Sequence, residues 1–157
     1  METAYLETPI GTLQCKGDAN GLATLYFIEE SIPTSQKIPK DLENTIYQLQ
    51  EYFDGKRTDF DLKLAPQGTD FQKRVWKQLQ TIPFGKTCSY LDMAKALGDP
   101  KVIRAAASAN GKNPLSIIIP CHRVIGSDGT LTGYAGGISR KKWLLEHEQP
   151  FKQQTLF

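Results

Sequence analysis

Residues 117–124 read Ile-Ile-Ile-Pro-Cys-His-Arg-Val, and the rest of the chain is best understood from this stretch. Three β-branched residues in a row predict a buried strand, which Pro120 ends because proline has no N–H group to donate. Cys121 therefore stands where regular structure stops. His122 can take the thiol proton, and Arg123 can favour the thiolate over a thiol of pKa about 8.5. Since isolated cysteines are most often buried and inert, a reactive and a structural thiol both stay open at this point.

The composition is that of a soluble globular protein. The 157 residues are 39% hydrophobic and 23% charged, and no apolar run approaches the roughly 20 residues of a spanning helix. The first residues, METAYLETPIGTL, are polar and alternate like a strand rather than forming a signal peptide. We therefore expect a cytoplasmic protein with no membrane partner.

Cysteine usage and net charge narrow the possible classes further. Cys15, Cys88 and Cys121 are odd in number, far apart, and lack Cys-x-x-Cys spacing, which argues against both a disulfide scaffold and a zinc site. We expect no metal and no cofactor. The net charge is +2 and the pI about 8.4, below the value of about 9 that marks strongly basic nucleic-acid domains. A nucleic-acid surface would have to be a local patch.

The first third of the chain predicts a small β unit followed by a helix. Short alternating runs at 3–8, 12–16 and 22–28 are separated by plausible hairpin turns. Apolar residues then recur at helical spacing from Leu42 to Phe53, and Gly55 suits a C-terminal cap. Alternation over 60–64 predicts one more strand. This part carries no constellation of catalytic residues, so we interpret residues 1–66 as a scaffold domain and 67–157 as a second domain.

The second domain begins with three predicted helices. Thr69 and Gln72 form a capping-box pattern at the start of the first, which ends at the turn 82–85. Ser89 with Asp92 starts the second, which ends at Gly98. The third covers 101–110, after an Asp cap at 99 and a Pro at 100. Two short helices joined at a Gly-containing turn are typical of a helix-turn-helix.

The third predicted helix has features that suit contact with DNA. It is rich in alanine and carries Arg104. Small side chains let a helix approach a duplex closely, and a long cation can then enter the base stack or pair with phosphate. The alternative is that Ala105 to Ala107 pack against a neighbouring helix while Arg104 is solvated.

A glycine-rich loop and a last helix follow the cysteine. Residues 126–137 hold five glycines and Tyr134 but match neither the dinucleotide fingerprint nor the P-loop. We interpret the loop as folding over a planar ligand, with Tyr134 as a wall. Ser139 is expected to cap a helix that bears Trp143 and His147, and the tail from Gln149 is polar.

Together these residues resemble the signature of the O6-alkylguanine-DNA alkyltransferases, also called methylated-DNA–protein-cysteine methyltransferases. The resemblance covers residues 69–148 and is carried by Tyr90, Arg104, Asn113, Pro120, Cys121, His122, Arg123, Val124, Gly133, Tyr134, Ala135, Gly136, Gly137, Trp143, Leu144, Leu145, His147 and Glu148. It implies an α+β protein with an N-terminal ribonuclease-H-like α/β domain. The second domain would be mainly helical and winged-helix-like, with a helix-turn-helix and the active-site cysteine.

The resemblance implies direct repair of DNA, with an alkyl group moved from O6 of guanine, and less readily from O4 of thymine, onto Cys121. His122 would activate the thiol through a water, oriented by Glu148, and Tyr90 would donate a proton to the leaving guanine. A bridging water also suits adjacent side chains of an extended strand, which point apart. Arg104 would fill the gap that a flipped nucleotide leaves, with its helix in the minor groove.

The same resemblance assigns further DNA and pocket residues. Ser89, Lys112 and Ser127 would contact DNA, and Asn113, Val124, Tyr134 and Ala135 would form or support the pocket. Ala135 stands where some members have Ser, and Lys112 where others have Arg. The acceptor position holds Cys rather than the Trp of the alkyltransferase-like proteins, which bind alkylated DNA without repairing it.

The resemblance further predicts a monomer that binds double-stranded DNA containing O6-alkylguanine. No group in the sequence could displace the thioether product, so each molecule should react once. Two other classes stay open from the sequence: a DNA-binding damage sensor or regulator with a structural Cys121, and a cysteine hydrolase that uses Cys121, His122 and Glu148.

Overall fold

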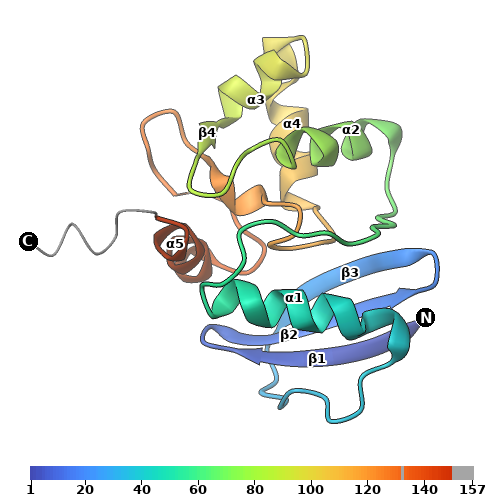
Figure 1. Cartoon of the computed structure of the whole chain (residues 1–157). Coiled ribbons are helices and arrows are strands. Elements are labelled where there is room, and N and C mark those ends of the chain that lie inside the picture. Colours follow the sequence, from blue (N-terminus) through green and yellow to red (C-terminus); the bar gives the residue numbers. More distant parts are fainter. Residues whose placement is uncertain (132, 150–157) are drawn as a thin grey trace, which may run out of the picture. The chain divides into compact units, whose positions relative to one another are not determined.

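The computed structural model describes residues 1–131 and 133–149 (Figure 1). The chain divides into two compact units, residues 1–68 with 114–118 and residues 69–113 with 119–157. The sequence assigns 114–118 to the second domain, whereas here they join the first unit; the boundary after residue 66 stays a prediction. Within the described ranges, no helix combines the length and the apolar character needed to cross a membrane.

The first unit is built on an antiparallel sheet in the order β1-β2-β3, formed by β1 (Glu2–Thr8), β2 (Gly11–Asp18) and β3 (Gly21–Ile28). Both hairpin turns are where the sequence predicts them. Gly11 and Gly21 follow the turns with φ of 125° and 131°, values that favour glycine because it lacks a Cβ. Cross-strand pairing of Leu6 with Leu13, and of Cys15 with Leu25, gathers buried side chains on one face of the sheet.

Helix α1 (Glu43–Phe53) packs on this sheet after a short 3-10 turn, η1 (Lys40–Leu42) (Figure 1). Leu42, Ile46 and Leu49 of the predicted stripe are buried at 2% exposure or less, whereas Phe53 is half-buried and the adjacent Tyr52 is fully buried instead. Gly55 ends the helix with a φ of 77°, as the sequence predicts. Burial of this stripe against the sheet supplies the hydrophobic core of the unit.

The strand predicted over 60–64 is wrong. Only Leu64 forms a bridge, to Leu22, where Leu22 donates to the Lys63 carbonyl at 2.9 Å and accepts from the Ala65 N–H at 2.8 Å. Upstream, the Gln48 side chain bonds both the N–H and the carbonyl of Asp61. A side chain thus satisfies backbone groups that a ladder would otherwise pair, and the extended segment stays outside the sheet.

The second unit is mainly helical. Its helices are α2 (Asp70–Leu79), α3 (Tyr90–Ala96), α4 (Ile103–Gly111) and α5 (Ile138–His147), with short 3-10 turns η2 (Pro100–Val102) and η3 (Cys121–Arg123). Strands β4 (Cys88–Ser89) and β5 (Val124–Ile125) form a short parallel pair. The predicted capping box at Thr69 is confirmed, with its side chain accepting from Gln72 N–H, and the predicted helix start at Ser89 is a second capping box, with Ser89 accepting from Asp92 N–H. The predicted helix-turn-helix corresponds to α3 and α4, which pack against each other.

Two predictions in this half are wrong. Residues 117–119 are buried as expected but form turns rather than a strand. Ile117 has a φ of 73°, and Ile118 donates to the Ser116 carbonyl two residues back, so the backbone groups are satisfied locally. Ser139 does not cap α5, because the N-cap position is Gly137, which makes no side-chain cap.

Candidate active site

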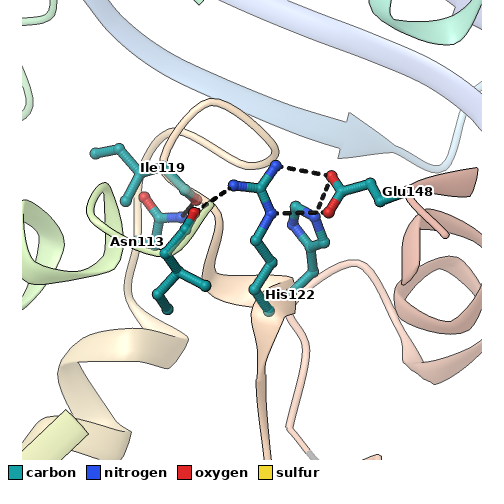
Figure 2. A network of polar contacts seen from close by, with 6 residues as sticks. Asn113, Ile119, His122 and Glu148 are labelled. Carbon is teal, nitrogen blue, oxygen red and sulfur yellow. Dashed lines mark hydrogen bonds and ion pairs between the residues drawn. The ribbon is translucent and has the colours of Figure 1, made fainter. Parts of the chain in front are cut away.

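Cys121 begins the 3-10 turn η3 and is 5% exposed. The expected extended geometry at this residue is therefore wrong, and the thiol sits in a tight turn directly after Pro120. The turn is held from behind by Asn113, whose Nδ2 donates to the Ile119 carbonyl at 2.7 Å (Figure 2). The amide of Asn113 thus links the end of α4 to the segment that carries the cysteine.

Glu148, at the end of α5, joins the two residues that follow the cysteine. Its Oε2 lies 2.8 Å from Nε2 of His122, and its two oxygens accept from Nε and Nη2 of Arg123 at 2.7 and 3.0 Å (Figure 2). The third arm of the guanidinium, Nη1, donates to the Ile82 carbonyl at 2.7 Å. All three side chains are at most 8% exposed. The bidentate pair fixes the carboxylate in two directions, as paired N–H groups of arginine do.

The electrostatics of this cluster keep the carboxylate ionised and the imidazole neutral. Burial by itself raises the pKa of Glu148, but the hydrogen bonds from His122 and Arg123, together with the positive charge of Arg123, outweigh it and lower the pKa to about 2. The pKa of His122 is lowered, chiefly by burial, although the contact with Glu148 opposes this shift. At neutral pH the cluster is thus an ion pair of Glu148 with Arg123 beside a neutral imidazole.

The contact with Glu148 also sets the tautomer of His122. An ionised carboxylate only accepts hydrogen bonds, so Nε2 must carry the proton and Nδ1 must hold the lone pair. Nδ1 is buried and has no hydrogen-bond partner in the described part of the chain. The imidazole is therefore ready to accept a proton at Nδ1, which is what a general base requires.

The three thiols differ in their surroundings. Burial raises the pKa of Cys15 to about 11, and it raises the pKa of Cys88, where the nearby Asp92 carboxylate adds to the effect. Burial also raises the pKa of Cys121, but a hydrogen bond from Asn113 and the charge of Lys141 oppose it. Cys121 alone combines these opposing groups with an adjacent base, so it is the thiol equipped to react.

A cavity of about 650 Å³ opens beside α4. Its lining brings together five of the residues that carry the family resemblance, Tyr90, Arg104, Gly133, Tyr134 and Ala135, and adds Ile103, Ala107 and Gly111. A Cβ placed on Gly133 would lie 3.6 Å from the Tyr90 hydroxyl oxygen, so that hydroxyl faces the glycine-rich loop. Tyr134 is buried and Arg104 exposed. The expected tyrosine wall and the exposed arginine thus meet at one cavity.

Other residues predicted for the site lie outside this lining. Asn113 and Val124 are buried behind the active-site turn, where Asn113 holds Ile119 and Val124 pairs with Cys88. Lys112 and Ser127 are exposed, and Ser89 is the N-cap of α3. Their predicted contacts with DNA stay predictions.

Lys141 is a functional candidate that sequence reasoning missed. It is fully buried in α5, and its Nζ donates to the Val124 carbonyl at 2.6 Å. A signal was available, because Lys141, Leu144 and Glu148 recur at helical spacing and all three are buried on one face. The contact of Arg123 with the Ile82 carbonyl was also missed, and no local pattern could have shown it. The described residues contain no group of three or more His, Cys, Asp or Glu side chains that could hold a metal.

Comparison with known proteins identifies the family of the chain. The sequence profile of the 6-O-methylguanine DNA methyltransferase ribonuclease-like domain matches residues 1–66, and that of the DNA-binding domain of the same proteins matches residues 70–150. The chain belongs to this family. The predicted α+β fold, with its ribonuclease-like and DNA-binding parts, is confirmed.

Relatives from archaea and bacteria match the chain over nearly its whole length. A methylated-DNA–protein-cysteine methyltransferase of Methanosarcina barkeri is 49% identical over 151 residues, which cover 92% of this chain and 94% of that protein. One of Mycobacterium tuberculosis is 47% identical over 92% of this chain and 90% of its own.

Solved structures agree with these relatives. The crystal structure of Mycobacterium tuberculosis OGT in complex with DNA superimposes with a TM-score of 0.84 at 47% identity, covering 92% of this chain and 91% of that one. Membership of the family favours repair by alkyl transfer over a DNA-binding sensor.

Proposed function

We propose that this protein reverses alkylation damage in DNA by moving the alkyl group from O6 of guanine, and less readily from O4 of thymine, onto the sulfur of Cys121. The observation that carries the proposal is the buried cluster in which His122 and Arg123, the two residues after Cys121, both contact Glu148. The chain belongs to a family named for 6-O-methylguanine. Attack on an alkyl carbon needs a soft nucleophile, and a thiolate is the strongest one that a protein side chain supplies.

His122 is the base in this scheme, and Glu148 is its partner. The thiol proton passes to Nδ1, through a water in the mechanism that the resemblance implies. The imidazolium that forms is stabilised by the ionised Glu148 at 2.8 Å. Arg123 holds Glu148 from its other side, so the carboxylate cannot turn away from the ring as the charge develops. Arg123 thereby acts on the thiol through Glu148 rather than directly.

The cavity beside α4 is the proposed pocket for the flipped base. A base inside a duplex cannot reach a thiol that is 5% exposed, so the nucleotide must leave the stack at a cost of a few kcal/mol. Arg104 is exposed at this cavity and takes the space that the nucleotide vacates. Tyr134 forms a wall for the base. The helix α4 that bears Arg104 would then lie in the minor groove.

The bonds and protons of the reaction balance without a cofactor. The S–C bond to Cys121 forms as the C–O6 bond breaks, and the leaving guanine anion takes a proton from the Tyr90 hydroxyl. The phenolate regains a proton from the His122 imidazolium, so the proton of the thiol ends on guanine. The thioether is stable and no side chain of the site can displace it. Each molecule therefore repairs one base.

The charge distribution supports DNA contact through the second unit. Residues 69–113 and 119–157 hold 13 of the 19 Lys and Arg but only six of the 17 Asp and Glu, so this unit is basic and the first unit acidic. Attraction to phosphate would therefore concentrate on the second unit, where Ser89, Lys112 and Ser127 are the predicted contacts. We propose that the protein acts on double-stranded DNA as a monomer in the cytoplasm.

Titrating a duplex that holds one O6-methylguanine with the protein, and measuring the nucleosides after digestion, tests the proposal. We expect one lesion to revert to guanine per molecule of protein, and none with Cys121→Ser. Binding without reversal would support a damage sensor instead. Turnover of esters or peptides without DNA would support a cysteine hydrolase.

A further inference from the structure

Lys141 is an unusual charged residue of the second unit, because lysine is almost never fully buried unless its charge has a partner. It lies in the first turns of α5 at 0% exposure, and its Nζ donates to the Val124 carbonyl at 2.6 Å. Burial lowers the pKa of this ammonium, whereas a negative charge on Cys121 raises it. Removing the Lys141 ammonium from water is unfavourable, and the fold nevertheless keeps it where it interacts with the charge of Cys121.

The same ammonium lies near both groups that carry negative charge during the proposed reaction. Its Nζ is 6.0 Å from the centre of the Tyr90 ring, and its charge opposes the increase that burial causes in the pKa of Cys121. Cys121 holds the negative charge before transfer, and Tyr90 holds it after giving its proton to guanine. Lys141 is therefore near the anion at both ends of the reaction.

We propose that Lys141 is a positioning residue whose fixed positive charge stabilises the anion as it passes from the Cys121 sulfur through guanine O6 to the Tyr90 oxygen. This inference rests on the proposed function and adds to it a group outside the cysteine, histidine and glutamate. The ammonium gains and loses no proton in the reaction. It serves as a preorganised charge in a site with little water, where such charges act most strongly.

The other charged groups around the thiol cannot serve as the fixed positive charge that stabilises the anion. Arg123 is already engaged by Glu148 through two hydrogen bonds and by the Ile82 carbonyl through a third. His122 becomes positive only when it accepts the thiol proton, and its charge is then shared with Glu148. Lys141 comes from a different element, α5, and its bond to the Val124 carbonyl leaves the charge of the ammonium intact.

Two substitutions separate the charge of Lys141 from its hydrogen bond. Lys141→Gln keeps a donor for the Val124 carbonyl and removes the charge, whereas Lys141→Met removes both. Lys142→Gln, at the exposed neighbouring position, makes the same change in net charge as a matched control. Thermal unfolding and affinity for an unmodified duplex show whether each variant is folded.

The readout is the single-turnover rate of methyl transfer between pH 5 and 9, with thiolate absorbance followed in parallel. A unit charge about 6 Å away in an effective dielectric of about 20 corresponds to a rate change on the order of 100-fold. We expect both Lys141 variants to lose rate by roughly that factor at pH 7 and to form the thiolate at higher pH. Lys142→Gln should match the wild type in both measurements.

Each possible result has a distinct meaning. Folded Lys141 variants that keep the wild-type pH profile would overturn the inference, even if their rates fell equally at all pH values, because a structural anchor would do only that. If Lys141→Met does not fold, Lys141→Gln still decides the question. Failure of the wild type itself to transfer the methyl group would refute the proposed function rather than the role of Lys141.

Discussion

Replacing Glu148 by glutamine removes one negative charge from a cluster in which it contacts two side chains. The carboxylate is 2% exposed, accepts twice from Arg123 and lies 2.8 Å from His122. Glutamine has nearly the same shape but offers only one acceptor oxygen. Arg123 would therefore stay buried with an uncompensated charge, and the amide could donate to Nε2 of His122 and reverse its tautomer.

The pKa of Glu148 sets the size of the expected effect. Its fall from 4.5 to about 2 in the folded protein corresponds to roughly 3 kcal/mol at about 1.36 kcal/mol per pH unit. A carboxyl group whose pKa is lowered on folding stabilises the protein fully above its unfolded pKa, and the stabilisation is lost as the pH falls through the folded value. The contribution should therefore be complete at pH 7 and disappear between about pH 4.5 and 2.

Urea unfolding of Glu148→Gln at pH 7 should show a free energy of unfolding roughly 3 kcal/mol below that of the wild type, and the difference should shrink below pH 4.5. Glu146→Gln, at an exposed position on the same helix, is the control and should change stability little. Methyl transfer by Glu148→Gln should slow by roughly 100-fold or more, the usual contribution of a general base. A variant within 1 kcal/mol of the wild type that also transfers at the wild-type rate would refute this reasoning.

Three further predictions concern DNA and stability. Arg104→Ala should slow repair of a duplex far more than repair of the same lesion in a single strand, since only the duplex requires flipping; equal defects in parallel rate measurements would count against the arginine as a wedge. Thr69→Ala should lower the free energy of unfolding by about 1 kcal/mol in urea through loss of the capping box with Gln72. Trp76→Phe should cost roughly 1–3 kcal/mol in the same assay, because the buried Ala109 carbonyl loses the Nε1–H donor at 2.9 Å.

The features that the sequence predicts correctly are local ones. The capping boxes at Thr69 and Ser89 each need a polar side chain and a partner three residues later, so spacing alone identifies them. The hairpin turns need glycine at a fixed place, and the helix stripe of α1 needs only its own periodicity. In these elements the local preference and the tertiary structure agree.

The stretch 117–120 shows where that approach fails. Three β-branched residues predict a strand, and their burial is correct, but Ile117 adopts a left-handed conformation that its side chain disfavours. Before Ile117 in the chain, the Pro114 carbonyl accepts from Leu25 N–H and the Ser116 N–H donates to the Leu25 carbonyl. After Ile117, the Ile119 carbonyl accepts from the side chain of Asn113. These hydrogen bonds join residues that are distant in sequence or depend on side-chain orientation, so no local sequence pattern predicts them.

Some residues of the active site could likewise be identified from the sequence, whereas others became evident only from the structure. Cys121 and His122 are adjacent and could be proposed from the chemistry of their side chains. Glu148 came from a family resemblance, and the position of Arg123 between Glu148 and the Ile82 carbonyl came only from the structure. Lys141 shares the helical spacing of Leu144 and Glu148, but lysines of a helix usually face solvent, so the spacing had to be combined with its burial in the structure before it became a candidate.

The central claim is that Cys121 itself receives the alkyl group, and the mass of the intact protein tests this most directly. After mixing with a short duplex that holds one O6-methylguanine, the wild type should gain the mass of one methylene group, and peptide mapping should place it on Cys121. The gain should stop at one per molecule and be absent from Cys121→Ser. Tight binding to the duplex with no change in mass, or a methyl group found on Cys88 or Cys15, would contradict the account.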